Sequence, residues 1–173
     1  VDADIAARTI VEPNKPAWQE IKEFFGPDVL LADQTLNRAW LRQQVFADND
    51  KRKKLEAITH PHIREEIIRN LAESNSPFTI LVSPLLIESG QFKLVEKIIV
   101  VDVPESIQIE RTSYRDQNSS DQIKRIISTQ LSKHKRLSYA DYVISNIQDF
   151  NSENATLDTQ VLNIYNKLLS LTC

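Results

Sequence analysis

Two short apolar runs, FTILV at residues 78–82 and IIVVDV at residues 98–103, decide how this sequence folds. Both runs are apolar at nearly every position and rich in residues that favour strands. Strands of that kind are buried on both faces, as in a parallel sheet covered by helices. Because helical patterns surround these runs, the sequence predicts an α/β fold with a doubly wound parallel sheet.

Helical spacing of apolar residues predicts most of the remaining chain to be helical. We expect Gly26-Pro27 to end one helix, Asp48 or Asn49 to cap another, and Pro61 to interrupt that helix and start the next. The expected helices cover residues 5–10, 18–25, 37–46, about 49–60, 61–71, 106–115, 122–135 and 156–171, and a last strand covers residues 142–144.

The order of these elements predicts an inserted lobe. Consecutive helices without strands occupy residues 13–77, which we interpret as a helical lobe inserted into a core formed by residues 1–12 and 78–173. The helix at 122–135 is polar and basic with little apolar surface. We therefore interpret residues from about 116 to 138 as a lid within the core.

Composition narrows the class of protein. With 41% hydrophobic and 26% charged residues, the chain is typical of a soluble globular protein. Its net charge of −3 argues against general nucleic-acid binding, and its apolar runs are too short to span a bilayer. The only cysteine, Cys173, cannot form an internal disulfide, so we expect a cytoplasmic protein; the oligomeric state stays open.

The chain opens on VDAD, residues 1–4, which we interpret as the end of a buried strand. It has no methionine, and its two glycines are Gly26 and Gly90. In α/β phosphotransferases, the segment before such a strand holds the glycine-rich phosphate loop. We therefore expect that the chain lacks its opening segment, including that loop.

Three segments are expected at the carboxyl ends of the strands, where ligands bind in such sheets. They are residues 2–4, 83–88 and 102–104. Asp4 could position or deprotonate an attacking hydroxyl, while a nearby carboxylate, Asp2, holds Mg²⁺. The alternative for Asp4 is capping of the helix that follows it.

Basic residues supply the other candidates. Arg111 and Arg115 are four residues apart, so they share a helix face and could converge on one anion. The alternative is an ordinary solvated helix with Glu110 or Asp116 as a partner. His60 has no metal-ligand spacing around it, which favours a structural or substrate-contacting imidazole.

Taken together, the motifs along nearly the whole chain resemble dephospho-coenzyme A kinase in order and spacing. The matching segments are VDADIAAR (1–8), VEP (11–13), LNRAWLR (36–42), VF (45–46), HPHIR (60–64), PLLIE (84–88), VVDVP (100–104), QIER (108–111), RD (115–116), Gln130, Arg136 and ADYVISN (140–146).

The resemblance implies a P-loop core, a helical CoA-binding lobe, a lid, and transfer of the γ-phosphoryl group of ATP, with Mg²⁺, to the 3′-hydroxyl of dephospho-CoA. It implies that Asp4 is the catalytic carboxylate, that Arg111 stabilises the transferring phosphoryl group, and that Arg115 contacts the nucleotide phosphates. The remaining assignments are a dephospho-CoA site bordered by Arg8, His60, Arg64, Leu85 and Leu86, and an ATP side with Arg136 and Asn146. No nucleic-acid or membrane partner is expected.

The chain departs from the family pattern at three places. The glycine-rich loop is absent, Gln34 stands where a turn glycine is common, and Ile147-Gln148 replaces an Asn-Gly-like turn. Two alternatives stay open: a truncated fragment that binds CoA-like ligands without turnover, and a kinase for another nucleotide-like acceptor such as a nucleoside monophosphate.

Overall fold

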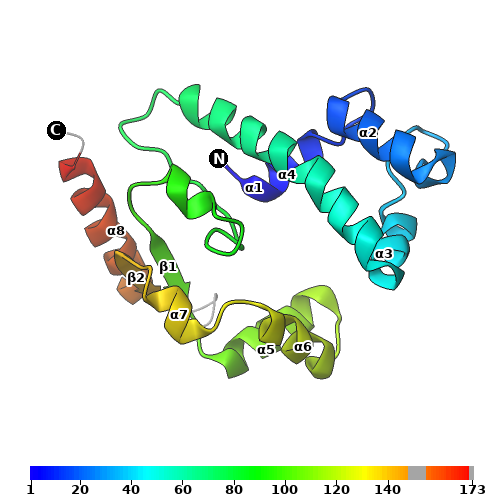
Figure 1. The fold of residues 1–173 in the computed structure, drawn as a ribbon. Coiled ribbons are helices and arrows are strands. Elements are labelled where there is room, and N and C mark those ends of the chain that lie inside the picture. The colour runs from blue at the N-terminus through cyan, green and yellow to red at the C-terminus, as the bar shows by residue number, and fades with distance from the viewer. Residues whose placement is uncertain (148–154, 172–173) are drawn as a thin grey trace. The chain divides into compact units, whose positions relative to one another are not determined.

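The computed structural model describes residues 1–147 and 155–171, and the chain divides into two compact units, Val1–Pro84 and Leu85–Cys173 (Figure 1). Each unit is described by itself. Within the described residues, no helix combines the length and the apolar character that crossing a bilayer requires. The boundaries predicted for the core, the helical lobe and the lid stay predictions.

The first unit is built around one long helix. Its helices are α1 (Ala3–Thr9), α2 (Pro16–Phe25), the 3₁₀ turn η1 (Pro27–Val29), α3 (Arg38–Ala47) and α4 (Asn49–Ala72). α4 packs against α1, α2 and α3. The core between these helices consists of Ile10, Val11, Ala17, Trp18, Ile21, Val29, Leu36, Leu41 and Ile58.

The helix ends follow the signals in the sequence. Gly26 ends α2 with a φ of 82°, a conformation that favours glycine. The Asn37 side chain accepts a hydrogen bond from the backbone N–H of Trp40, and the Asp48 side chain caps α4. Gln34 has a φ of 67°, so it adopts the left-handed conformation that favours glycine.

The predicted break at Pro61 is wrong, because α4 continues through this residue. A proline inside a helix removes one hydrogen bond and costs about 3 kcal/mol. Apolar side chains on both sides of Pro61 are deeply buried, with Ile58 4% and Ile67 0% exposed. Their packing keeps one helix where the local signal predicts two.

The predicted strand at residues 78–82 forms only a single parallel bridge, between Val82 and Asp2. The Val1 amine donates to the Ile80 carbonyl at 2.8 Å, Val82 N–H donates to the Val1 carbonyl at 2.8 Å, and Ala3 N–H donates to the Val82 carbonyl at 2.9 Å. The pairing stops at Ala3 because α1 begins there. The expectation of a longer strand is therefore corrected to a short parallel contact.

The second unit is an α/β unit with a parallel sheet. Its elements are η2 (Gln91–Leu94), β1 (Ile99–Asp102), α5 (Glu105–Asp116), α6 (Ser120–Thr129), α7 (Lys133–Leu137), β2 (Tyr142–Ser145) and α8 (Ala155–Ser170). β1 and β2 pair in parallel, from Ile99 opposite Tyr142 to Asp102 opposite Ser145. The crossover between the two strands carries α5, α6 and α7, and α8 contacts β2. These strands and flanking helices confirm the α/β prediction.

The single helix predicted at residues 122–135 is wrong, because the chain forms α6 and α7 instead. Ser119 starts α6 through a capping box with Gln122, and the Ser132 side chain accepts a hydrogen bond from Lys135 N–H at the start of α7. α6 also has an apolar side that the prediction missed. Ile123 is buried at 2% exposure, and α6 packs against α5.

The Asp141 carboxylate connects the amino ends of β1 and β2 through hydrogen bonds. Asp141 accepts a hydrogen bond from Ile98 N–H at 2.9 Å and one from the Lys97 ammonium at 3.0 Å. These bonds lower the pKa of Asp141 below 3.8, the Ile98 bond most, and the hydrogen bond with the Asp141 carboxylate raises the pKa of Lys97. The folded state therefore favours the ionised form of Asp141.

Asp141→Asn is expected to destabilise the protein at neutral pH but not in strong acid. Because the folded pKa lies below the unfolded one, the carboxylate stabilises the fold above pH 3.8 and this contribution is lost as the pH falls through the folded pKa. Urea unfolding of both proteins between about pH 2 and 7 checks this. Lys97→Met should lower the stability at neutral pH by part of the amount lost in Asp141→Asn. If the free energies of unfolding of wild type and Asp141→Asn differed by the same amount at every pH, the prediction would be wrong.

Candidate functional site

Five of the predicted site residues lie in the first unit, on two helices that pack together. Asp4 and Arg8 are one turn apart on α1, and His60 and Arg64 are one turn apart on α4. All four residues are exposed. Small buried residues, Ala3 and Ala6, occur on α1, which allows this short helix to approach α4 closely. The fold thus makes these polar groups available to a ligand of the first unit.

The fifth residue, Asp2, caps α1. Its Oδ1 accepts hydrogen bonds from the backbone N–H groups of Asp4 at 2.8 Å and Ile5 at 3.2 Å. The capping role considered for Asp4 therefore belongs to Asp2, and within residues 1–147 and 155–171 the Asp4 carboxylate makes no hydrogen bond or ion pair. A carboxylate without a structural partner is available to contact a substrate.

Asp2 is also the predicted magnesium ligand. Over the part of the chain that the structure describes, no three His, Cys, Asp or Glu side chains group in a way that could hold a metal ion. One oxygen of Asp2 is already used by the helix cap. The described residues thus do not assemble a magnesium site of their own, and the role of Asp2 as a magnesium ligand stays a prediction.

In the second unit, predicted residues meet at the carboxyl ends of the strands. Arg111 Nη1 donates a hydrogen bond to the backbone carbonyl of Asn146 at 3.0 Å. Asn146 N–H in turn donates to the carbonyl of Asp102, the last residue of β1, at 3.0 Å. The structure therefore brings the half-buried Arg111 of α5 to the end of β2, the edge of the sheet where ligands of α/β proteins bind.

Arg115 is engaged differently from Arg111. Its guanidinium donates two hydrogen bonds to the Asp116 carboxylate, Nε at 2.6 Å and Nη2 at 2.8 Å. This pair lowers the pKa of Asp116 and raises the pKa of Arg115. Arg115 is also 75% exposed. The partner considered from the sequence is thus present, and convergence of the two arginines on one anion stays a prediction.

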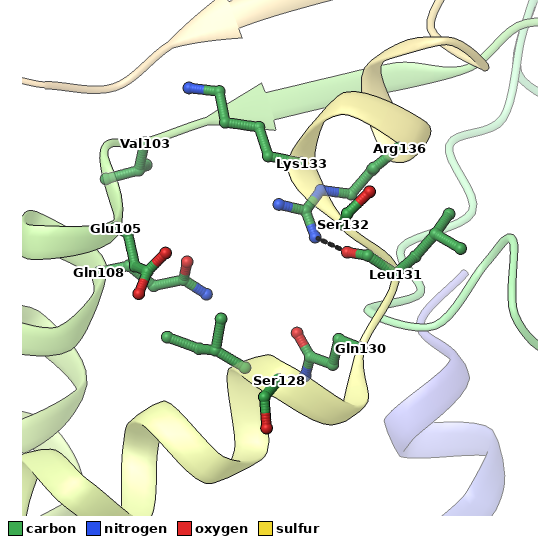
Figure 2. A pocket seen from close by; sticks show the side chains of 10 residues that line it. Val103, Glu105, Gln108, Ser128, Gln130, Leu131, Ser132, Lys133 and Arg136 are labelled. Atoms are coloured by element: carbon green, nitrogen blue, oxygen red, sulfur yellow. Dashed lines mark hydrogen bonds between the residues drawn. The ribbon is translucent and has the colours of Figure 1, made fainter.

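A pocket of about 270 Å³ lies beside the end of β1. Figure 2 shows side chains of α5 on one side and of α7 and the segment before it on the other. Arg136 lines this pocket and donates from Nη1 to the Leu131 carbonyl at 3.5 Å. The lining residues are Val103, Glu105, Gln108, Ile127, Ser128, Gln130, Leu131, Ser132, Lys133 and Arg136. Its polar side chains and the Arg136 guanidinium suit an anionic ligand.

Leu85 and Leu86 lie in a turn of the second unit. Ser89 N–H and its hydroxyl both donate to the Leu85 carbonyl, and Phe92 N–H donates to the Leu86 carbonyl. Leu85 is 46% exposed, so its side chain offers apolar surface. Their contact with a ligand stays a prediction.

The sequence reasoning assigned no role to an ion pair beside the pocket. Lys133 Nζ donates to Asp102 Oδ2 at 2.8 Å. The two residues are 31 positions apart, so no helical or strand periodicity connects them. The available signal was positional: Asp102 ends a predicted strand, where polar side chains of parallel sheets gather.

Comparison with known proteins shows to which family this chain belongs. The family model described as dephospho-CoA kinase matches residues 1–151. The chain belongs to the dephospho-CoA kinase family. The matched range includes every predicted site residue, from Asp2 to Asn146.

Curated relatives of this chain carry the name of the same family. A dephospho-CoA kinase of Aggregatibacter actinomycetemcomitans is 43% identical over 98% of this chain and 82% of its own length. One of Hahella chejuensis is 46% identical over 86% of this chain and 72% of its own.

Two solved structures share the fold. A dephospho-CoA kinase from Campylobacter jejuni has a TM-score of 0.70 at 25% identity, and the match covers 100% of this chain and 86% of that one. The crystal structure of TT1252 from Thermus thermophilus has a TM-score of 0.79 at 24% identity. The match covers 97% of this chain and 83% of that one. The second likeness concerns the fold alone.

Proposed function

We propose that the protein transfers the γ-phosphoryl group of ATP to the 3′-hydroxyl of dephospho-CoA, the last step of CoA biosynthesis. The observation that carries this proposal is the family match over residues 1–151, together with relatives named dephospho-CoA kinase at 43% and 46% identity. The polar cluster at the carboxyl ends of β1 and β2 supports it, because nucleotide chemistry in α/β folds occurs at that edge.

The proposed chemistry depends on position and charge, since phosphoryl transfer needs little covalent participation from the protein. Asp4 accepts or orients the proton of the attacking 3′-hydroxyl, for which its unpaired, exposed carboxylate is suited. Arg111 stabilises negative charge on the transferring phosphoryl group. Arg115 contacts the nucleotide phosphates after exchanging its Asp116 partner for them.

The substrates are assigned to different residues. On the dephospho-CoA side we propose Arg8, His60 and Arg64, with Leu85 and Leu86 near the apolar part of the ligand. Arg136 and Asn146 serve ATP, which is supported by the place of Arg136 in a pocket with polar and cationic walls. Mg²⁺ arrives with ATP, and a magnesium ion bound through phosphates and water needs few protein ligands.

The finer architecture follows the same proposal. We expect a doubly wound core of the P-loop type, a helical CoA-binding lobe at residues 13–77, and a lid at about 116–138 that includes α6. A cytoplasmic location fits a biosynthetic kinase that uses ATP. Neither a nucleic acid nor a membrane is proposed as a partner.

The decisive experiment measures phosphorylation of dephospho-CoA with MgATP, followed by ³¹P NMR of the product. A new monoester signal at the 3′ position, together with ADP, is the expected result. The 173 residues contain only two glycines and no glycine-rich phosphate loop, so the product of the whole reading frame is assayed beside the 173-residue chain.

Two control acceptors make the assay specific. CoA already carries a 3′-phosphate and should not react, whereas a nucleoside monophosphate tests the alternative acceptor class. Faster turnover of the nucleoside monophosphate than of dephospho-CoA, or no 3′-phosphorylation by the whole product, would overturn the proposal.

A further inference from the structure

Two acidic side chains hold the segment that joins α6 to α7. Leu131 N–H donates to Glu88 Oε1 at 3.0 Å, and Lys133 Nζ donates to Asp102 Oδ2 at 2.8 Å. Glu88 belongs to the turn at residues 84–90, and Asp102 ends β1. The segment at residues 130–133 is therefore tied at two neighbouring positions to two different parts of the second unit.

The same segment builds one wall of the pocket. Half of the lining residues come from it and from α7, and Arg136 reaches back to the Leu131 carbonyl at 3.5 Å (Figure 2). Leu131 thus has one backbone group held by Glu88 and the other held by Arg136. Any displacement of Leu131 also displaces the partner that orients the Arg136 guanidinium.

We propose that Glu88 and Asp102 are positioning residues that fix this wall, and through it Arg136, for the phosphates of ATP. Lys133 is the tether to Asp102 and not a phosphate ligand. This inference rests on the proposed function, because it assumes that Arg136 serves ATP. Neither acidic residue touches the substrate in this proposal.

The exposure of the ion pair supports a positioning role over a stabilising one. The Asp102 side chain is 23% exposed and that of Lys133 is 51% exposed. Pairs in contact with water add little to the free energy of unfolding, so loss of this pair should leave the fold intact. Displacement of a binding group by about 1 Å, however, lowers rates by as much as about a hundredfold.

A double-mutant cycle separates the tether from a phosphate ligand. If Lys133 acts through Asp102, Asp102→Asn and Lys133→Met each lower kcat/KM for ATP roughly tenfold, and the double variant loses little more. If Lys133 binds phosphate itself, Lys133→Met acts alone and Asp102→Asn leaves kcat/KM unchanged or raises it. That second result would overturn the proposal.

The Glu88 contact is tested by two variants of similar size. Glu88→Gln keeps a carbonyl oxygen that can accept from Leu131 N–H, whereas Glu88→Leu removes the acceptor. We expect kcat/KM for ATP to remain within about threefold in the first variant and to fall roughly tenfold in the second. Equal losses in both variants would show that the charge, and not the hydrogen bond, matters, which contradicts the proposal.

Lys97→Met provides the matched control, because Lys97 and Asp141 form an ion pair of 3.0 Å at the opposite ends of the same strands. Its kcat/KM for ATP should stay at the wild-type value. Amide hydrogen exchange of residues 130–136 adds a readout without catalysis: Glu88→Leu and Asp102→Asn should accelerate it, and Lys97→Met should not. Unchanged hydrogen exchange in these variants would overturn the positioning role of Glu88 and Asp102, even if no kinase activity were found. Failure of this inference can therefore be told apart from failure of the proposed function.

Discussion

Asp4→Asn is expected to lower the rate of dephospho-CoA phosphorylation by a factor of about 10² to 10⁴, the usual contribution of a positioned acid or base. An amide of the same shape can still contact the hydroxyl but cannot take its proton. Steady-state kinetics with MgATP and dephospho-CoA report this loss as a lower kcat, while KM for dephospho-CoA should change little.

The fold should survive this substitution. Asp2, and not Asp4, accepts the hydrogen bonds that start α1. Asp4 contributes only as an acidic residue in the first turn of α1, where a carboxylate stabilises the helix dipole by about 0.3 to 1 kcal/mol. A large loss of activity in Asp4→Asn would therefore concern the chemistry and not the helix.

The chain offers a matched control for Asp4 in α4. Asp48 caps α4 by accepting from Asp50 N–H at 2.9 Å and Lys51 N–H at 3.1 Å, the same pattern that Asp2 makes at α1. Asp50 therefore stands in α4 where Asp4 stands in α1. Asp50→Asn should lose similar stability and keep wild-type kcat. Equal activity losses in Asp4→Asn and Asp50→Asn would rule out a catalytic carboxylate at position 4.

Local chemistry explains which parts of the fold were predictable from the sequence. The end of α2 at Gly26 was predicted correctly, and Asp48, one of the two residues considered, caps α4, because caps and breakers act within a few residues. β1 and β2 were recognised from their apolar runs. The errors arose where packing decides: the burial of Ile58 and Ile67 carries α4 through Pro61.

The candidate site shows the same division between local and distant information. Motifs selected Arg111 and Asn146 separately, and the hydrogen bond between them joins residues 35 positions apart. Neither that bond nor the contact of Lys133 with Asp102 could be predicted, because each depends on how α5 and α7 return to the strand ends. The Arg115 pair with Asp116 was among the predicted alternatives because the two residues are adjacent.

Arg111→Met is expected to lower kcat by a factor of about 10³ or more, as when the arginine that stabilises a transferring phosphoryl group is removed. Part of the guanidinium is already used, since Nη1 donates to the Asn146 carbonyl. This bond orients the planar group, which carries five N–H donors in all. Arg111→Lys keeps the charge but loses the fork of donors, so we expect a kcat between those of the wild type and Arg111→Met.

Loss of the bond to Asn146 also affects stability, so the activity of Arg111→Met must be normalised to the folded fraction. A hydrogen bond from a charged donor contributes about 1.5 to 3 kcal/mol, which urea unfolding will detect. Arg125→Met, an exposed arginine of α6, controls for the loss of one positive charge in the same unit. If kcat per folded molecule of Arg111→Met stayed within tenfold of wild type, Arg111 would only join α5 to the end of β2. If the loss were confined to kcat and Arg125→Met were unaffected, the Arg111 guanidinium would have to stabilise negative charge that develops during the transfer. A purely structural hydrogen bond stabilises the transition state and the bound substrates equally, so its loss would not lower kcat selectively.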